Sequence, residues 1–159
     1  LGQVMSKGDR MDYAIQKATE LGVTTIQLLT SERCEMRLKY DRDQKKIDHW
    51  QSVAIAACEQ CGMNIVPKIL APLRLEDWFN SNLPTTKLVL APNKDQVDVL
   101  NNVSKDLALL IGPEGGLSEA EINAANAVGF ENWCIGSRVL RTETAPVVAL
   151  AILNYRLAE

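Results

Sequence analysis

Two hydrophobic patterns alternate along this sequence, and their alternation restricts the fold more than any other feature does. Apolar residues at helical spacing, such as Met11, Ile15 and Ala18, are followed by a β-branched run over residues 23–29, and the same change recurs about five times. The strand patterns are nearly continuous in apolar residues, which is typical of a parallel sheet whose two faces are both covered by helices. We therefore expect a single α/β domain over residues 1–159.

The boundaries of the predicted elements come from turn and capping residues. Gly22, Gly62 and Gly129 each follow a helical pattern, and glycine commonly ends a helix because it tolerates left-handed backbone. Ser118 and Glu121 have the spacing of a capping box, which starts a helix. We expect helices over residues 10–22, 42–62, 75–81, 94–103, 118–129 and 146–158, and strands over residues 23–29, 64–70, 87–91, 106–111 and 131–135.

Composition describes an ordinary globular chain and excludes few functions. The net charge of −3 and the isoelectric point near 5.3 give no overall basic field for binding nucleic acid. No apolar run reaches the roughly 18 residues of a membrane span. The sequence begins with Leu1 rather than methionine, so we expect a fragment of a longer protein.

The four cysteines are interpreted as reduced thiols of a cytoplasmic protein, because a chain of this size and apolar content needs no disulfide staples. Cys58 and Cys61 form a C-x-x-C, which could indicate zinc or redox chemistry. A structural zinc site needs a second ligand pair, and the only histidine is His49. Residues 54–61 have the pattern of a helix interior, whereas a redox pair is expected at a strand-to-helix turn. We therefore predict buried helix positions and no metal.

Three predicted strands end in segments that are suited to ligand binding. The strand over 106–111 runs into Gly-Pro-Glu-Gly-Gly at 112–116, the next strand precedes a second glycine loop at 136–145, and the strand over 87–91 ends in Leu-Ala-Pro-Asn at 90–93. Ligands of open α/β sheets bind beyond the carboxyl ends of the strands. These three strand ends could therefore enclose one pocket.

The glycine turn does not match a phosphate site. A P-loop needs a lysine after its last glycine, whereas here no lysine follows Gly116 and Glu114 adds a negative charge. The dinucleotide pattern G-x-G-x-x-G is absent as well. Exposed backbone groups of such a turn can instead bind a neutral heterocycle, and a nearby carboxylate tolerates a cationic ligand. The alternative is a tight turn and a capped helix with no ligand.

Arginines near the strand ends allow several roles. Arg138 and Arg141 could clamp phosphate, activate a substrate, or form a structural ion pair with Glu143. Arg33 and Arg37 follow the first predicted strand, where they form either a solvated basic face or a contact to an RNA backbone.

Several segments together resemble a known family. Residues 17–23, 31–33, 54–62, 109–122 and 139–145 have the order and spacing of the RsmE family, from about Gly8 to Leu157. The RsmE family comprises bacterial methyltransferases that modify N3 of a uridine in 16S ribosomal RNA. The pairing of Ile-Gly-Pro-Glu-Gly-Gly with Leu-Arg-Thr-Glu-Thr-Ala is the most specific part of the resemblance.

The resemblance implies a fold, a cofactor and an assembly. The fold is of the SPOUT class, in which the C-terminal part of a parallel α/β sheet forms a trefoil knot, and its members are typically homodimers. The cofactor is S-adenosylmethionine (SAM), whose product is S-adenosylhomocysteine, and no metal is implied. The residues that would bind the cofactor are Leu90, Ala91, Ile111, Gly112, Pro113, Glu114, Gly115, Gly116, Ile135, Gly136, Ser137, Val139, Leu140 and Arg141.

Members of the family also carry an N-terminal PUA-like RNA-binding domain, which is absent from this chain. Two positions depart from the family pattern. Met63 replaces a basic residue that often follows the Glu-Gln-Cys-Gly segment, and Ser137 occupies a position where proline is frequent. The first departure weakens an RNA contact there, and the second changes the stiffness of the loop.

The implied reaction gives each charged residue a hypothetical role. N3 of uridine must lose its proton before it is a good nucleophile, so we expect Arg141 to stabilise charge on the uracil carbonyls and Glu143 to orient Arg141 or relay the proton. Arg33, Arg37 and Arg138 are expected to bind 16S ribosomal RNA of the small ribosomal subunit. The alternatives are a SPOUT enzyme acting on a ribose 2′-OH or on tRNA, and a non-catalytic RNA-binding module.

Overall fold

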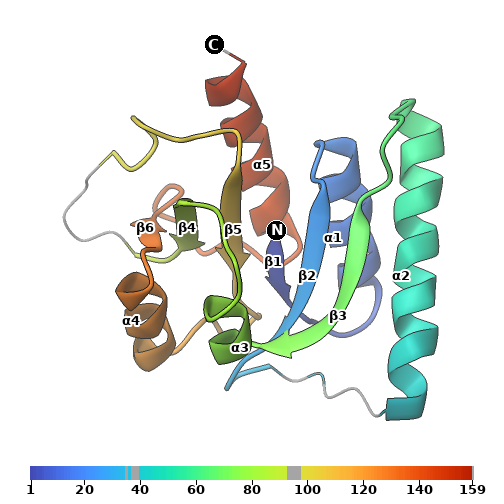
Figure 1. Cartoon of the computed structure of the whole chain (residues 1–159), viewed down its shortest axis with the longest axis horizontal. Helices are drawn as coiled ribbons and strands as arrows, with labels where there is room; N and C mark the ends of the chain where they lie inside the picture. Colours follow the sequence, from blue (N-terminus) through green and yellow to red (C-terminus); the bar gives the residue numbers. More distant parts are fainter. Residues whose placement is uncertain (35, 37–39, 93–97, 159) are drawn as a thin grey trace.

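The computed structural model describes residues 1–34, 36, 40–92 and 98–158 (Figure 1). The strands are β1 (Gly2–Val4), β2 (Thr25–Thr30), β3 (Lys68–Arg74), β4 (Thr86–Leu90), β5 (Leu107–Ile111) and β6 (Glu131–Trp133). The helices are α1 (Asp9–Glu20), α2 (Tyr40–Cys61), α3 (Leu75–Phe79), α4 (Glu119–Ala127) and α5 (Thr144–Leu157).

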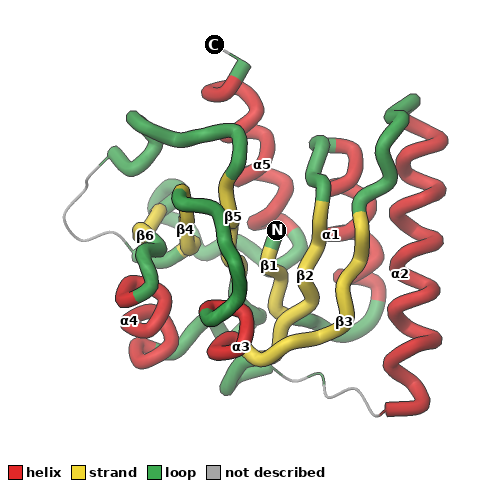
Figure 2. Tube along the Cα trace, viewed as in Figure 1, coloured by secondary structure: helices red, strands yellow, loops and turns green. Residues whose placement is uncertain are grey.

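The strands form one sheet in the order β3-β2-β1-β5-β4-β6. Every pairing between them is parallel, as the sequence predicts. Strand β1 lies in the middle, where Gln3 is opposite Leu28 of β2 and Ile111 of β5. Strand β1 was not predicted from the sequence, because its three residues are too few to show a hydrophobic period. Parallel pairing brings the carboxyl ends of all six strands to one edge (Figure 2).

Helices cover both faces of the sheet, which confirms the predicted layers. Helix α1 packs against α2 and α5 on one face, and α3 and α4 contact each other on the other (Figure 1). On the α3 side, the rings of Trp78 and Phe79 each lie 5.5 Å from the ring of Phe130, centroid to centroid. Gly2 lies beneath Trp78, where any added side chain would overlap the indole ring.

Strand β3 begins later than predicted and contains a bulge. Its register against β2 shifts between Gln27 and Leu29, and the Gln27 side chain donates a hydrogen bond of 2.7 Å to the Ala71 carbonyl there. Pro72, which has no N–H to donate, also lies in this irregular stretch, as expected for proline in a strand.

The predicted helix over residues 94–103 is wrong where it can be checked. Residues 94–97 lie outside the described residues, and residues 98–103 form turns rather than a helix. The Asp98 carboxylate accepts a hydrogen bond of 3.0 Å from the Leu100 amide, which satisfies the backbone in a non-helical conformation. Strand β6 is also shorter than predicted and ends at Trp133.

The C-x-x-C lies within α2, as predicted. The Cys58 thiol is buried and donates to the Ile65 carbonyl. Cys61 is exposed, so the prediction of a buried position is wrong for Cys61, which lies in the last turn of α2 next to Gly62. In the described part of the chain, no three His, Cys, Asp or Glu side chains lie close enough to hold a metal ion. Among the described helices, none has the length and apolar character needed to cross a membrane.

Helix α4 carries the predicted capping box. The Ser118 hydroxyl accepts a hydrogen bond of 3.1 Å from the Glu121 amide, and the Glu121 carboxylate accepts one of 2.9 Å from the Ser118 amide. We expect Ser118→Ala to lower the free energy of unfolding by about 1 kcal/mol in urea titrations, because the amide loses its partner. Ser118→Thr keeps a hydroxyl and is the matched control. An equal loss in both variants would contradict the role of the cap.

Candidate ligand-binding site at the carboxyl edge

The ends of β4, β5 and β6 enclose a cavity of about 530 Å³ at the carboxyl edge of the sheet. This volume lies within the range of small-molecule sites in proteins. Of the residues predicted to bind a cofactor, Leu90, Ala91, Ile111–Gly116, Ile135–Ser137, Val139 and Leu140 line the cavity. Arg141 does not line it, whereas Arg138, which was predicted for RNA, does.

The glycine turn at 112–116 forms one wall of this cavity. The Gly116 amide donates a hydrogen bond of 2.8 Å to the Pro113 carbonyl, and Gly116 has a φ of 76°. A Cβ atom at Gly112 would lie 2.8 Å from Cγ of Leu117 and 3.3 Å from its amide nitrogen. Close packing therefore requires glycine at 112, and the left-handed backbone favours glycine at 116.

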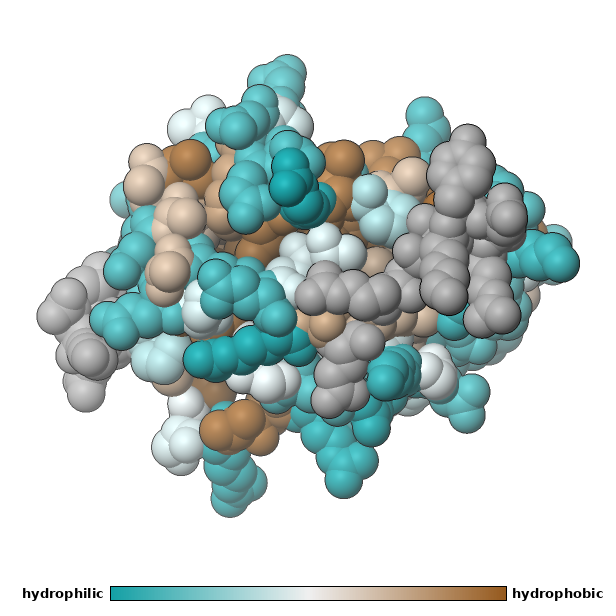
Figure 3. All heavy atoms as spheres, turned by 90° about the horizontal axis from the view of Figure 1, so that it is seen from below, coloured by the Kyte–Doolittle hydropathy of each residue, from teal (hydrophilic) through white to brown (hydrophobic). Residues whose placement is uncertain are grey.

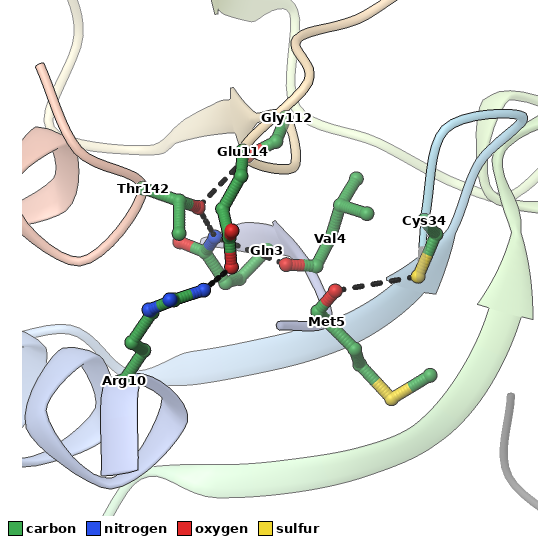
Figure 4. Close-up of polar contacts among 8 residues, drawn as sticks. All are labelled: Gln3, Val4, Met5, Arg10, Cys34, Gly112, Glu114 and Thr142. Atoms are coloured by element: carbon green, nitrogen blue, oxygen red, sulfur yellow. Dashed lines mark hydrogen bonds and ion pairs between the residues drawn. The ribbon is translucent and has the colours of Figure 1, made fainter. Parts of the chain in front are cut away.

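The first turn of α1 and the loop that follows β2 hold this turn from outside. The Arg10 guanidinium forms an ion pair with the Glu114 carboxylate (Figure 4). Nη1 of Arg33 donates a hydrogen bond of 3.0 Å to the Gly115 carbonyl, and the Glu32 amide donates one of 3.1 Å to the Glu121 carboxylate. The ion pair is partly exposed, so its own contribution to stability is at most about 1 kcal/mol.

These contacts change the interpretation of two predicted site residues. Because Arg10 pairs with Glu114, the carboxylate brings no uncompensated negative charge to the cavity. The Glu114 carboxylate was expected to tolerate a cationic ligand, and its pairing with Arg10 balances the negative charge on which that expectation depends. Arg33 was expected to contact RNA, and in this structure one of its N–H groups braces the glycine turn.

A chain of hydrogen bonds joins the C-terminal loop to the glycine turn (Figure 4). The Thr142 hydroxyl donates to the Gly112 carbonyl at 3.0 Å and accepts from Nε2 of Gln3 at 3.2 Å. The same Nε2 donates to the Val4 carbonyl at 3.1 Å. Three segments that are distant in sequence therefore meet at one wall of the cavity.

The two residues predicted to be catalytic lie beside Thr142, at the start of α5. The Arg141 side chain is exposed. The backbone carbonyl of Arg141 accepts hydrogen bonds of 2.9 Å from the Thr144 amide and 3.0 Å from the Ala145 amide. Oε2 of Glu143 is buried and has no hydrogen-bond partner among the described residues. An unpaired buried acceptor costs about 1–3 kcal/mol, so its retention needs an explanation.

The electrostatics of the lining argue against a polyphosphate ligand. Its charged residues are Glu114, which is paired with Arg10, and Arg138, which is exposed. The other lining side chains are apolar or small, and the three strand ends supply backbone N–H and C=O groups. Such a surface suits a flat neutral heterocycle with a few polar groups.

Figure 3 views the molecule from this edge of the sheet. Hydrophilic side chains cover much of the face, and apolar surface is exposed between them. Val139, in the loop after β6, is 98% exposed. Of the predicted RNA contacts, Arg33 and Arg138 are exposed, and Arg37 lies outside the described residues.

Some lining residues were not predicted from the sequence, among them Trp133, Cys134 and Thr142. Trp133 and Cys134 were assigned to the interior of a strand, which ends earlier than expected. Thr142 lies between Arg141 and Glu143, and the predicted roles were given to these two charged residues rather than to Thr142. No local pattern marks Gln3, because its partner is 139 residues away.

Thiol labelling tests the burial of the cysteines. Cys61 and Cys134 are exposed, whereas Cys34 and Cys58 are buried. Burial, together with the neighbouring Cys61, raises the pKa of the Cys58 thiol, so at pH 8 less of it is the reactive thiolate. We expect iodoacetamide to label Cys61 and Cys134 first, as followed by peptide mass spectrometry. Labelling of Cys58 in the native protein as fast as Cys61 would contradict this arrangement.

Comparison with known proteins shows the family to which the chain belongs. The family model described as RNA methyltransferase domain matches residues 1–154. The chain is 38% identical to Ribosomal RNA small subunit methyltransferase E of Buchnera aphidicola subsp. Schizaphis graminum, with 100% of this chain and 65% of the relative aligned. For the protein of the same name from Bacillus subtilis, identity is 31%, over 96% of this chain and 63% of the relative. The chain thus spans less than two thirds of the length of these relatives.

Solved structures agree with this comparison. A Legionella pneumophila protein in complex with bound SAM matches with a TM-score of 0.92 and 39% identity, over 97% of this chain and 64% of that one. The Ribosomal RNA small subunit methyltransferase E from Neisseria gonorrhoeae, bound to SAM, gives a TM-score of 0.86 and 37% identity, with the same coverage. An Aquifex aeolicus TrmH/SpoU tRNA modifying enzyme, at a TM-score of 0.59 and 13% identity, shares the fold alone.

Proposed function

The chain belongs to the RNA methyltransferase domain family, and its predicted resemblance to RsmE proteins is confirmed, so we propose that it transfers a methyl group from SAM to N3 of a uridine in 16S ribosomal RNA. The observation that carries the proposal is the cavity at the ends of β4, β5 and β6, one wall of which is the glycine turn at 112–116. Relatives that are 39% and 37% identical were solved with SAM bound.

The residues of the cavity fit SAM. The adenine ring would lie against apolar side chains such as Leu90 and Leu140, with backbone groups of the strand ends to read its polar edge. The close packing at Gly112 leaves no room for a side chain, so the backbone itself can approach a ligand. SAM carries no phosphate, which agrees with a lining whose carboxylate is already paired and whose only described arginine is Arg138.

SAM supplies a methyl group on a sulfonium, and the protein must prepare the acceptor nitrogen. N3 of uridine loses its proton as it attacks, and negative charge spreads onto the two uracil carbonyls. The exposed guanidinium of Arg141 would stabilise that charge. The unpaired Oε2 of Glu143 would accept the N3 proton or orient Arg141. Because Arg141 lies outside the cavity lining, we assign it to the RNA substrate rather than to the cofactor.

The RNA would approach from the carboxyl edge. Arg33, Arg37 and Arg138 are proposed to contact its phosphates, and a stacked target uridine would have to flip out of its helix. Arg33 would do so with the N–H groups that do not brace the Gly115 carbonyl. We place the reaction in the cytoplasm, where the small ribosomal subunit is assembled.

Three further features belong to the same proposal. After β6, which lies at one edge of the sheet, the chain returns toward the middle of the sheet. There the Thr142 hydroxyl donates a hydrogen bond to the carbonyl of Gly112, the residue after β5, and this return supports a trefoil knot. The exposed Val139 side chain supports a homodimer that covers the loop after β6. Residues 1–159 would be the catalytic domain, with a PUA-like RNA-binding domain preceding it in the complete protein.

The alternatives make different predictions. A SPOUT enzyme that modifies a ribose 2′-OH or tRNA would bind SAM and yield a different methylated nucleoside. A non-catalytic RNA-binding module would bind RNA and leave the nucleoside unmodified. Product analysis therefore separates all three functions.

Substitution in the glycine turn tests the cofactor site. A methyl group at Gly112 would collide with Leu117, so we expect Gly112→Ala to weaken SAM binding at least tenfold in isothermal titration calorimetry. At Gly115 the added Cβ would lie 3.4 Å from Cβ of Arg33, which is an ordinary contact, so Gly115→Ala is expected to lose less SAM affinity than Gly112→Ala. Equal affinities for wild type and Gly112→Ala would contradict a cofactor in this cavity.

Methylation of small ribosomal subunits that lack the modification tests the reaction. Labelled SAM and the complete protein should yield 3-methyluridine, identified by mass spectrometry of the digested RNA. We expect Arg141→Ala to lower the rate by about 10²-fold or more with little change in SAM affinity, because it removes charge stabilisation. Arg156→Ala, on α5 near the C-terminus, is the matched control. Another methylated nucleoside would refute the substrate, and an unchanged rate for Arg141→Ala would refute its role.

A further inference from the structure

A glutamine on the central strand is buried without lining the cavity. The side chain of Gln3 is 1% exposed and lies on β1, between β2 and β5. It reaches Thr142, which is 139 positions later in the chain and does line the cavity. Its neighbour Gly2 packs beneath Trp78 on the other face of the sheet, so Gln3 faces the side from which the C-terminal loop arrives.

The donors and acceptors in this chain of hydrogen bonds allow only one orientation of the Gln3 side-chain amide. The Thr142 hydroxyl has a single proton, and it donates that proton to the Gly112 carbonyl, which can only accept. Gln3 must therefore donate to Thr142, and its second N–H is directed to the Val4 carbonyl. Reversing the amide would place its oxygen against the Val4 carbonyl and the Thr142 lone pairs.

This orientation leaves Oε1 of Gln3 with no hydrogen-bond partner among the described residues. A buried acceptor without a partner opposes folding, and an apolar side chain of similar shape would avoid that cost. What the glutamine supplies, and an apolar residue cannot, is a donor that fixes the Thr142 hydroxyl.

We propose that Gln3 is a positioning residue of the cofactor site, which acts through Thr142 to hold the C-terminal loop at a fixed distance from the glycine turn. The cavity lies between these two segments, so their separation sets its width. Thr142 is also flanked by Arg141 and Glu143, so the same contact fixes where those side chains begin. This inference rests on the proposed function, because it takes the cavity as the site of SAM.

Three single variants and one double variant separate a positioning role of Gln3 from a merely structural one. Gln3→Met keeps the length of the side chain and removes the donor, and Thr142→Val keeps the shape and removes the hydroxyl. Thr142→Ser keeps the hydroxyl and is the conservative control. SAM affinity is measured by isothermal titration calorimetry and Tm by calorimetric scanning, for each variant and for the double variant Gln3→Met/Thr142→Val.

We expect Gln3→Met and Thr142→Val each to weaken SAM binding by about three- to tenfold, the value of one hydrogen bond. Gln3→Met also removes the unpaired oxygen, so its Tm should stay within about 3 °C of wild type. The double variant should bind no more weakly than Thr142→Val alone, because both changes break one chain of contacts. Thr142→Ser should restore most of the affinity. If Gln3→Met does not fold, the SAM affinities of Thr142→Val and Thr142→Ser are compared instead, and they decide whether the hydroxyl positions the loop.

Two results would overturn the inference, and they differ in what else they affect. Wild-type affinity in Gln3→Met, or in Thr142→Val when Gln3→Met does not fold, overturns the positioning role and leaves the proposed function intact. The same holds for a lowered Tm without loss of affinity. Failure of the wild-type protein itself to bind SAM overturns the proposed function, and the positioning role with it.

Discussion

Strand β1 joins the two halves of the sheet, because Gly2–Val4 pair in parallel with β2 on one side and Gly2 and Gln3 pair in parallel with β5 on the other. Without this strand, the start of α1 and the loop after β2 would not meet the glycine turn after β5. Parallel pairing also brings every strand end to one edge, because each crossover connection returns the chain to the opposite edge. The braces from Arg10 and Arg33, the bond from Thr142 and the cavity itself all depend on this alignment.

Much of this fold follows from local sequence patterns. Helices α1 and α2 end before glycines with positive φ, Gly22 and Gly62, and their amphipathic spacing is unambiguous. Local patterns failed where a distant partner decides the structure. Strand β1 exists because β2 and β5 supply its hydrogen bonds. Within the predicted helix after β4, the described residues 98–103 instead form turns, one of which is closed by the Asp98 side chain.

In the candidate site too, local patterns predicted some features, whereas contacts between distant residues set the others. The sequence placed three strand ends around one pocket, since that follows from a parallel sheet. It could not show that Glu114 is paired with Arg10, or that Gln3 reaches Thr142, because both contacts join residues more than 100 positions apart. The electrostatic argument drawn from Glu114 was therefore incomplete. The exclusion of a phosphate loop remains, since it rests on the missing lysine and the nearly neutral lining.

A crystal structure of the protein grown with S-adenosylhomocysteine would locate the ligand itself, whereas affinities only infer its site. We expect the nucleoside between the end of β4, the 112–116 turn and the loop after β6, with Gly112 in contact and Gln3 out of contact with the ligand. Ligand bound elsewhere on the molecule, or this cavity empty at a saturating ligand concentration, would contradict this expectation.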